Sequence, residues 1–351
     1  MAPVNIIFVL KRSQQSWGQV PTYGYHSSGL LNSARFVSDM LCEAGFNSTL
    51  QEVVDGNEID RVVTEANADV VILEAIWCPP SKLRELVGMR SHKCRKWIVR
   101  SHSQLPFLAL EGFSLGWFLE YTSIPGVNIS CNSHVATEDL NWIQASRAPS
   151  YTPVIFLPNY YPLPGGLPVR STTLHGELNV GCFGAVRPLK NHIQQAVASI
   201  ELAAILGISK LRFHINSSRR ECQGDPVVKS LRDLFAGHPV AELVEHGWLD
   251  RRAFLQLCYR MDICTQVSFS ETCNLALLDA VSQGVPVVGS PEIPWLPKEL
   301  QASPTSIPDI VSKMRHALNL SKLGHRNAEI WAREYANRSK RTWLQFLPHQ
   351  L

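Results

Sequence analysis

The chain has 351 residues, a length that suggests two domains. An apolar share of 45% and a charged share of 18% exclude a collagen-like, low-complexity or wholly disordered chain. The 33 basic and 30 acidic residues leave a mildly basic net charge of +3, which neither requires nor excludes a nucleic-acid partner, although such binders usually show a stronger or more clustered excess. No apolar run reaches the roughly 18 residues that a membrane span requires.

The first half of the chain alternates short apolar runs with amphipathic stretches. An apolar run at 4–10 is too short for a secretory signal and predicts a buried first strand. The expected strands are 5–10, 48–54, 69–77, 97–102, 128–132 and 154–158, and the expected helices include 30–44, 59–66 and 81–88. This alternation predicts a parallel sheet covered by helices on both faces, hence a doubly wound α/β domain.

A second series of the same kind follows a segment rich in proline and glycine. Its expected strands are 179–185, 210–216, 241–245, 262–267 and 285–289, and its expected helices are 191–206, 226–235, 251–258, 272–282, 307–318 and 325–346. We therefore expect an N-terminal domain over 1–160, a linker over 161–177 and a second Rossmann-like domain over 178–322. The last segment, 323–351, is expected to be a helix that packs back on the N-terminal domain. Ligands of such sheets bind beyond the carboxyl ends of the strands.

The segment FSETCNLALLDAVSQGVPVV at 269–288 combines a strand end, an acidic turn and a helix. If the helix begins at Thr272, the backbone amides of Cys273, Asn274 and Leu275 point out of its N-terminus. Such amides bind phosphate readily.

Two carboxylates of this segment, Glu271 and Asp279, are eight positions apart, a little over two helical turns. They can lie on one broad face, where the second can accept the hydroxyls of a ribose. The alternative is that Glu271 caps the helix and Asp279 is a solvated charge, and the spacing alone does not decide between the two.

The segment GCFGAVRPLKNH at 181–192 predicts a strand, a turn at Gly184 and a helix. Arg187 and Lys190 lie where the strand ends, and two cations there can neutralise a diphosphate leaving group. Cations are unfavourable at the start of a helix, which indicates a bound anion nearby.

Together these two segments resemble the family-4 class of retaining glycosyltransferases, through Glu271-x7-Asp279 followed by GVPVV and through Gly184-x-x-Arg187-x-x-Lys190. The resemblance implies the α/β fold called GT-B, two Rossmann-like doubly wound domains facing an interdomain cleft. It implies that Arg187 and Lys190 bind the diphosphate of a nucleotide-sugar, that Glu271 contacts the donor sugar and that Asp279 contacts the ribose. Asp279 stands where the family usually has Glu, so its carboxylate is one methylene shorter.

The first domain contributes two further candidates. His102 ends an expected strand, and the family resemblance implies a histidine there beside the donor sugar. The long loop after the first strand carries Gly18 and Gly24 and resembles a flexible loop that closes on donor and acceptor. At its end, Gly29 lets the backbone approach phosphate closely.

We therefore expect a metal-independent retaining glycosyltransferase without a prosthetic group, whose donor is a nucleotide-diphosphate sugar, UDP-sugar before others. Its catalytic residues would be His102, Glu271, Arg187 and Lys190. The acceptor is either a saccharide or a 5-hydroxymethylated base in DNA. The sequences FSE at 269–271 and PEIPW at 291–295 are similar to glycosyltransferases of tailed phages, which raises the DNA acceptor. A DNA acceptor would need a basic channel, to which Lys11, Arg12, Arg35 and Arg100 could contribute.

Two other functions fit the same motifs. A GT-B nucleotide-sugar epimerase would turn over donor without an acceptor, and a non-catalytic subunit would only bind the sugar nucleotide.

The nine cysteines include no C-x-x-C pair, so we expect free thiols in a reducing compartment. The expected location is the cytoplasm, that of the host if the protein is encoded by a phage. The sequence predicts no oligomeric state.

Overall fold

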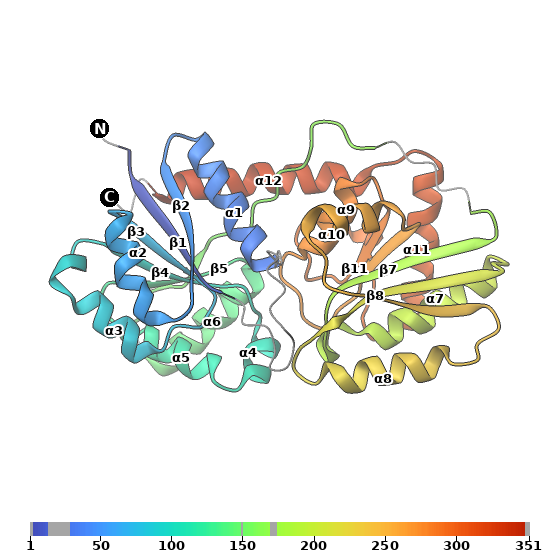
Figure 1. Ribbon diagram of the computed structural model, residues 1–351, viewed down its shortest axis with the longest axis horizontal. Helices are drawn as coiled ribbons and strands as arrows, with labels where there is room; N and C mark the ends of the chain where they lie inside the picture. Colours follow the sequence, from blue (N-terminus) through green and yellow to red (C-terminus); the bar gives the residue numbers. More distant parts are fainter. Residues whose placement is uncertain (1–2, 13–28, 149, 169–173, 348–351) are drawn as a thin grey trace. The chain divides into compact units, whose positions relative to one another are not determined.

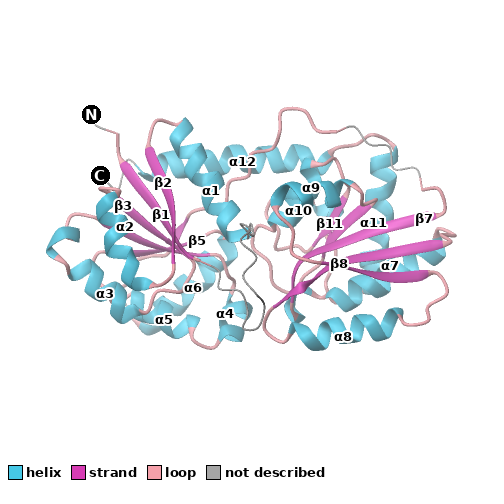
Figure 2. Ribbon diagram, in the orientation of Figure 1, coloured by secondary structure: helices cyan, strands magenta, loops and turns pink. Residues whose placement is uncertain are grey.

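The computed structural model describes residues 3–12, 29–148, 150–168 and 174–347. The chain divides into two compact units, each built around one parallel sheet (Figures 1 and 2). Unit 1 consists of Met1–Pro162 and Ala336–Leu351, and unit 2 of Leu163–Tyr335.

Unit 1 contains a six-stranded sheet in the order β2-β1-β3-β4-β5-β6, and all its pairings are parallel. The strands are β1 Asn5–Lys11, β2 Asn47–Val53, β3 Val70–Glu74, β4 Lys96–Ser101, β5 Val127–Cys131 and β6 Ile155–Phe156. The helices are α1 Gly29–Glu43, α2 Ile59–Glu65, α3 Pro80–Gly88, α4 Leu105–Glu111, α5 Ser114–Tyr121 and α6 His134–Arg147, with short 3-10 turns at η1 Gly56–Glu58 and η2 Arg90–His92.

Both faces of this sheet are buried, as its near-continuous apolar strands require. In β1, Ile6 and Phe8 point into one core with α1, whereas Ile7 and Val9 point into the other core with α2, α3, α5 and α6. This alternation is the period of two that a strand imposes on its side chains. The expected buried first strand and doubly wound α/β architecture are confirmed.

Unit 2 contains a five-stranded parallel sheet in the order β11-β10-β7-β8-β9. The strands are β7 Glu177–Val186, β8 Lys210–Arg220, β9 Ala241–His246, β10 Ile263–Gln266 and β11 Val287–Gly289. The helices are α7 His192–Ile205, α8 Gly224–Phe235, α9 Arg251–Tyr259, α10 Leu275–Ser282 and α11 Ile307–Lys322, with 3-10 turns at η3 Pro188–Lys190 and η4 Lys298–Leu300.

The last helix, α12 Asn327–Phe346, begins in unit 2 and ends in unit 1, whose boundary falls between Tyr335 and Ala336. Its Trp343 is fully buried in unit 1, 6.0 Å from Phe8 between ring centroids, and donates its Nε1–H to the carbonyl of Pro158 at 2.8 Å. The end of α12 is therefore part of the core of unit 1.

Two further expectations can be compared with the structure. All nine cysteines are free thiols. Among the described helices, none combines the length and the apolar character needed to span a membrane.

Candidate functional site

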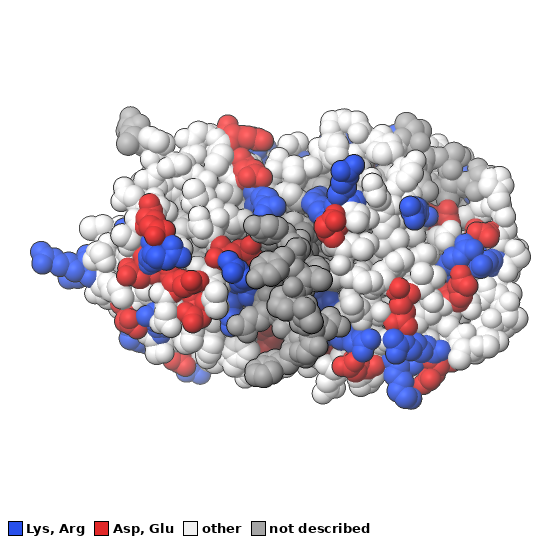
Figure 3. All heavy atoms as spheres, in the orientation of Figure 1, with Lys and Arg blue, Asp and Glu red and all other residues white. Residues whose placement is uncertain are grey.

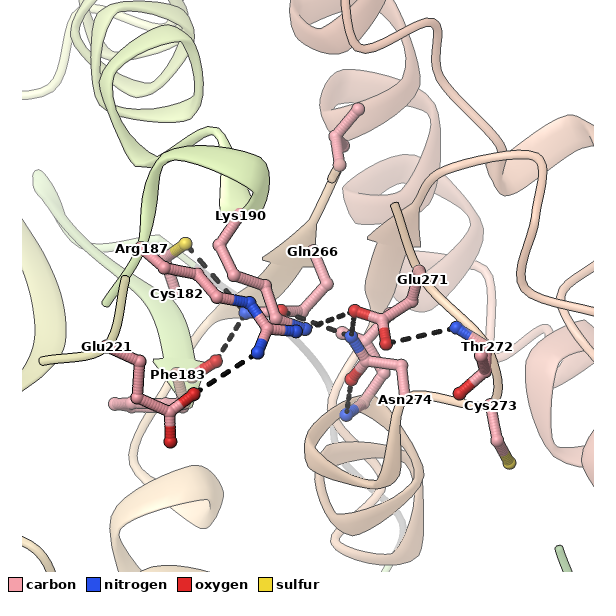
Figure 4. A network of polar contacts seen from close by, with 12 residues as sticks. Cys182, Phe183, Arg187, Lys190, Glu221, Gln266, Glu271, Thr272, Cys273 and Asn274 are labelled. Atoms are coloured by element: carbon pink, nitrogen blue, oxygen red, sulfur yellow. Dashed lines mark hydrogen bonds and ion pairs between the residues drawn. The ribbon is translucent and has the colours of Figure 1, made fainter. Parts of the chain in front are cut away.

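The cations predicted to bind phosphate lie together in unit 2, after the carboxyl end of β7. Arg187 directly follows β7, and Lys190 ends the 3-10 turn η3. Figure 4 shows both side chains pointing into the same space, between Glu221 on one side and Glu271 on the other. Glu271 comes from the loop that follows β10, the strand beside β7 in the sheet.

The backbone at Lys190 is held rigidly by its neighbours. Asn191 adopts the left-handed conformation with φ +56° and ends the turn. Its side-chain amide donates to the carbonyls of Val267 at 3.0 Å and Pro304 at 2.9 Å. Gln195 donates to the Lys190 carbonyl at 2.8 Å. These bonds hold the backbone of Lys190 beside the end of β10.

Glu271 is buried and accepts hydrogen bonds from three groups: Lys190 Nζ, Asn274 Nδ2 at 2.9 Å and the backbone N–H of Thr272 at 3.2 Å. Burial by itself would raise its pKa, but Lys190 and then Arg187 hold the pKa of this carboxyl below its ordinary value. Glu271 is therefore ionised at neutral pH and carries its own counter-ion.

The helix after Glu271 begins later than predicted. It starts at Leu275, not Thr272, because Asn274 adopts φ +54° and caps it by accepting from the backbone N–H of Leu277 at 2.9 Å. The amide of Cys273 thus precedes the helix and is not one of its terminal N–H groups. Glu271 does not cap the helix either, since Asn274 does so.

Asp279 is buried within α10 and forms an ion pair of 2.7 Å with Arg251, the first residue of α9. It is therefore not a solvated helix charge.

Arg187 has a carboxylate partner as well. Its Nη1 lies 3.2 Å from Oε2 of Glu221, which directly follows β8. Glu221 also accepts from Arg219 Nε at 2.7 Å, and the Arg219 guanidinium stacks 4.7 Å from the ring centroid of Trp248.

Gly184 lies within β7, not in a turn after it. Its φ of +110° strongly favours glycine, and its N–H donates to Asn216 Oδ1 at 3.0 Å. The pairing of β7 with β8 shifts register between Cys182 and Val186. This irregularity bends the strand end that carries Arg187.

His102 belongs to a separate polar centre in unit 1, at the carboxyl ends of β3, β4 and β5. Its Nε2 lies within hydrogen-bonding distance of Glu74 Oε2, and its Nδ1 is 3.2 Å from Asn132 Nδ2. Burial lowers the pKa of His102, with Glu74 opposing this effect and Arg100 adding to it. Ala75, directly after Glu74, has φ +71°, a strained conformation of the kind found near functional sites.

Arg100 is fully buried beneath His102 and cannot line a nucleic-acid channel. Its guanidinium donates to Glu74 at 3.0 Å, to the carbonyls of Leu157 and Pro158 at 3.1 and 2.9 Å, and to Asn159 Oδ1 at 2.7 Å. The expectation that Arg100 helps to form a basic channel for DNA was wrong, because Glu74 neutralises its charge inside the core.

The remaining predicted positions lie in the loop after β1 and at the start of α1. Gly29 is the exposed first residue of α1. The loop with Gly18 and Gly24 lies outside the described residues. Within the described ranges, no group of three or more His, Cys, Asp or Glu side chains could hold a metal ion.

Sequence reasoning missed Glu221, Arg251, Glu74 and the capping role of Asn274. Glu221 directly follows a strand and Arg251 begins a helix, and a charged residue at either place can be picked out in the sequence as a candidate site residue. Their pairing with Arg187 and Asp279 depends on strand order, which residue spacing does not reveal.

Neither a protein-family model nor a curated protein matches the chain. Solved structures do. A UDP-forming α,α-trehalose-phosphate synthase from Burkholderia vietnamiensis matches with a TM-score of 0.68 and 11% identity, covering 99% of this chain and 97% of that chain. Sucrose-phosphate synthase from Thermosynechococcus elongatus matches with a TM-score of 0.66 and 14% identity, covering 97% of each.

A point mutant of S. aureus TarM, crystallised with fondaparinux, α-GlcNAc-glycerol and UDP, matches with a TM-score of 0.59 and 12% identity. The match covers 82% of this chain and 57% of that chain, so this chain spans little more than half of TarM. At such identities the likeness concerns the fold, which is GT-B with two Rossmann-like domains.

Proposed function

We propose that the protein is a retaining glycosyltransferase that moves a sugar from a nucleotide-diphosphate sugar, UDP-sugar before others, to a saccharide hydroxyl. The observation that carries the proposal is the convergence of Arg187, Lys190 and Glu271 at one edge of the sheet in unit 2. Two cations beside an ionised carboxylate suit a diphosphate joined to a polyhydroxyl sugar. The solved structures crystallised with UDP or named as UDP-forming synthases support the nucleotide.

In this mechanism Arg187 and Lys190 bind the diphosphate and stabilise the charge that develops on it as it leaves. The bond between the sugar C1 and the phosphate oxygen breaks, and the acceptor oxygen forms its bond to C1 on the same face. The acceptor proton passes to the departing phosphate oxygen, so no separate base is needed. Glu271 holds the sugar, Asp279 holds the ribose, and His102 contributes a polar contact near the reacting carbon.

Charge favours a saccharide over DNA as the acceptor. Between Arg100 and Arg147 the chain has no lysine or arginine. This stretch supplies α4, α5 and α6, which follow the strand ends of unit 1 near His102. On the described part of the face in Figure 3, basic and acidic side chains are intermixed, without the extended basic stretch that duplex DNA requires.

Exposed aromatic side chains in the same stretch support the saccharide. Phe113 is 45% exposed and Trp142 is 77% exposed, so both present flat apolar faces to solvent. A sugar ring can pack on such a face while nearby carboxylates accept its hydroxyls.

A thermal-shift panel of UDP-, GDP-, ADP- and dTDP-sugars tests the donor, because a ligand that binds only the native state raises the melting temperature. Mass spectrometry with the stabilising donor and a set of oligosaccharides, glycosides and hydroxymethylated DNA then tests transfer. Glycosylated saccharide supports the proposal. Epimers have the same mass, so donor samples without acceptor are also separated by chromatography. Donor converted to its epimer indicates an epimerase, and donor binding without any reaction indicates a non-catalytic subunit. Modified DNA would replace the saccharide as acceptor.

A further inference from the structure

Each cation at the proposed diphosphate site is already paired with a carboxylate of the same unit. Lys190 contacts Glu271, and Arg187 contacts Glu221 (Figure 4). A diphosphate that binds these cations must therefore compete with two internal anions. The two pairs differ in how easily a diphosphate can replace the carboxylate.

The Arg187–Glu221 pair is the more exchangeable of the two. Its side chains are 17% and 26% exposed, whereas those of Lys190 and Glu271 are 11% and 9% exposed. An ion pair gains less net free energy as water reaches it, so a ligand can replace a partner in this pair at a smaller cost than in the Lys190–Glu271 pair. Glu271 is further held by Asn274 and by the Thr272 backbone, as described above.

Glu221 retains a cation when Arg187 turns toward a ligand. Oε1 of Glu221 contacts Arg219 at 2.7 Å, and Arg219 is steadied by its stack on Trp248. If Arg187 leaves Glu221 to bind a phosphate, Glu221 therefore still has Arg219 as its counter-ion. This second partner keeps the energetic cost of the exchange low.

A backbone hydrogen bond holds Glu221 close to Arg187. The N–H of Glu221 donates to the carbonyl of Val186 at 3.0 Å, directly before Arg187. The next two residues, Cys222 and Gln223, have φ of +44° and +69°, which side-chain-bearing residues adopt only at a cost. The strained turn thus holds a carboxylate beside the phosphate-binding arginine.

We propose that Glu221 is a displaceable counter-ion, which competes with the diphosphate for Arg187 and returns to it when the nucleoside diphosphate leaves. This inference rests on the proposed function. Transfer breaks the bond between the sugar and the phosphate oxygen, and that oxygen takes the acceptor proton. Once this proton passes to solvent, the nucleoside diphosphate carries one more negative charge than the donor did. A nearby carboxylate repels that product more than the donor, and Glu221 therefore favours product release.

Two substitutions with opposite expected effects test this role. Glu221→Gln keeps a hydrogen-bond acceptor for Arg187 but removes the competing charge, so UDP should bind about threefold tighter or more. Arg219→Gln removes the second partner of Glu221, so Glu221 should hold Arg187 more firmly and UDP should bind more weakly. Glu245→Gln, which breaks the surface pair with Arg232, is the control and should leave the affinity unchanged.

The affinities are measured by isothermal titration with UDP, GDP, ADP and dTDP, and the tightest ligand is compared across variants whose melting temperatures match the wild type. Opposite shifts in Glu221→Gln and Arg219→Gln support the exchange. Equal or weaker binding by Glu221→Gln would overturn it and make Glu221 a residue that only positions Arg187. Wild-type protein that binds none of the four ligands contradicts the proposed function as well, so the two failures are distinguishable.

Discussion

Lys190 and Glu271 are 81 positions apart in the chain, yet they form an ion pair where β7 and β10 end side by side. The pair exists because parallel neighbours bring their carboxyl ends to one edge of the sheet. The strands β7 and β10 are neighbours in the sheet but are not consecutive in the chain. The site therefore depends on the strand order of unit 2. The following predictions test the roles of the residues around this pair.

Lys190→Ala should weaken donor binding by about 10- to 100-fold, the value of a hydrogen bond to a charged group. It should also destabilise unit 2 by about 3 kcal/mol, because Glu271 is left buried without its cation. Adding Glu271→Gln should restore most of the stability but not the binding. Titration calorimetry and urea unfolding measure the two effects, with Lys229→Ala on the exposed face of α8 as the control. Unchanged binding in Lys190→Ala would remove the phosphate role.

Asp279→Asn should weaken binding of a nucleoside diphosphate by about tenfold, because the amide cannot accept two ribose hydroxyls as a carboxylate does. Binding of inorganic pyrophosphate, which has no ribose, should not change. Arg251→Gln also breaks the 2.7 Å ion pair but leaves the Asp279 carboxylate in place. A loss of nucleoside diphosphate binding that is larger in Asp279→Asn than in Arg251→Gln therefore indicates a ribose contact and not only a structural ion pair. Equal losses for both ligands would show that Asp279 only maintains the fold.

His102→Ala should lower turnover by about 100-fold, because it removes the proposed polar contact near the reacting carbon. Donor affinity should stay unchanged, because the residues proposed to bind the diphosphate belong to unit 2 and His102 belongs to unit 1. Glu74 keeps Arg100 as its counter-ion, so the variant should remain folded. His134→Ala, at the exposed start of α6, is the matched control in the same unit. The measurement is kcat with saturating donor and acceptor. A change in affinity alone would contradict a role at the reacting centre.

Stability should fall as the pH drops below about 6.5. Burial lowers the pKa of His192 to about 3, with Lys190 and Arg187 adding to the effect, and burial lowers the pKa of His214 to about 4. In the unfolded chain both histidines bind protons below about 6.5, whereas the folded chain keeps them neutral. The unfolded state is thus favoured progressively toward acid, by about 1.4 kcal/mol per pH unit for each histidine.

Thermal unfolding between pH 7 and 4.5 measures this effect. His192→Leu should make the acid loss of stability shallower, and His316→Leu, on the exposed face of α11, should not. Identical slopes for wild type and His192→Leu would show that this histidine is already charged in the folded protein.

The sheets of both units could be predicted because their strands are apolar runs buried on both faces, as in β1 and β4. The positions of Arg187, Lys190 and Glu271 could be predicted because each follows a strand of the same sheet. The start of α10 could not, since Asn274 in the left-handed conformation ends the preceding loop three residues later than the pattern indicated. A local capping choice of this kind leaves no trace in apolar periodicity.

The counter-ions could not be predicted for a different reason. Glu221 reaches Arg187 only because β8 pairs with β7 and a register shift bends the strand end. Arg100 was misassigned because a charged residue near a strand end is usually solvated, whereas here Glu74 and backbone carbonyls satisfy it in the core. Both features arise from contacts between distant segments, which residue spacing does not encode.

The central claim is that Arg187 and Lys190 together bind the diphosphate of a sugar nucleotide. Isothermal titration of UDP-sugars and UDP into the wild type and into the Arg187→Ala/Lys190→Ala variant tests it most directly. The account predicts saturable binding to the wild type and no measurable binding to a folded double variant. Equal affinity in both proteins would contradict it.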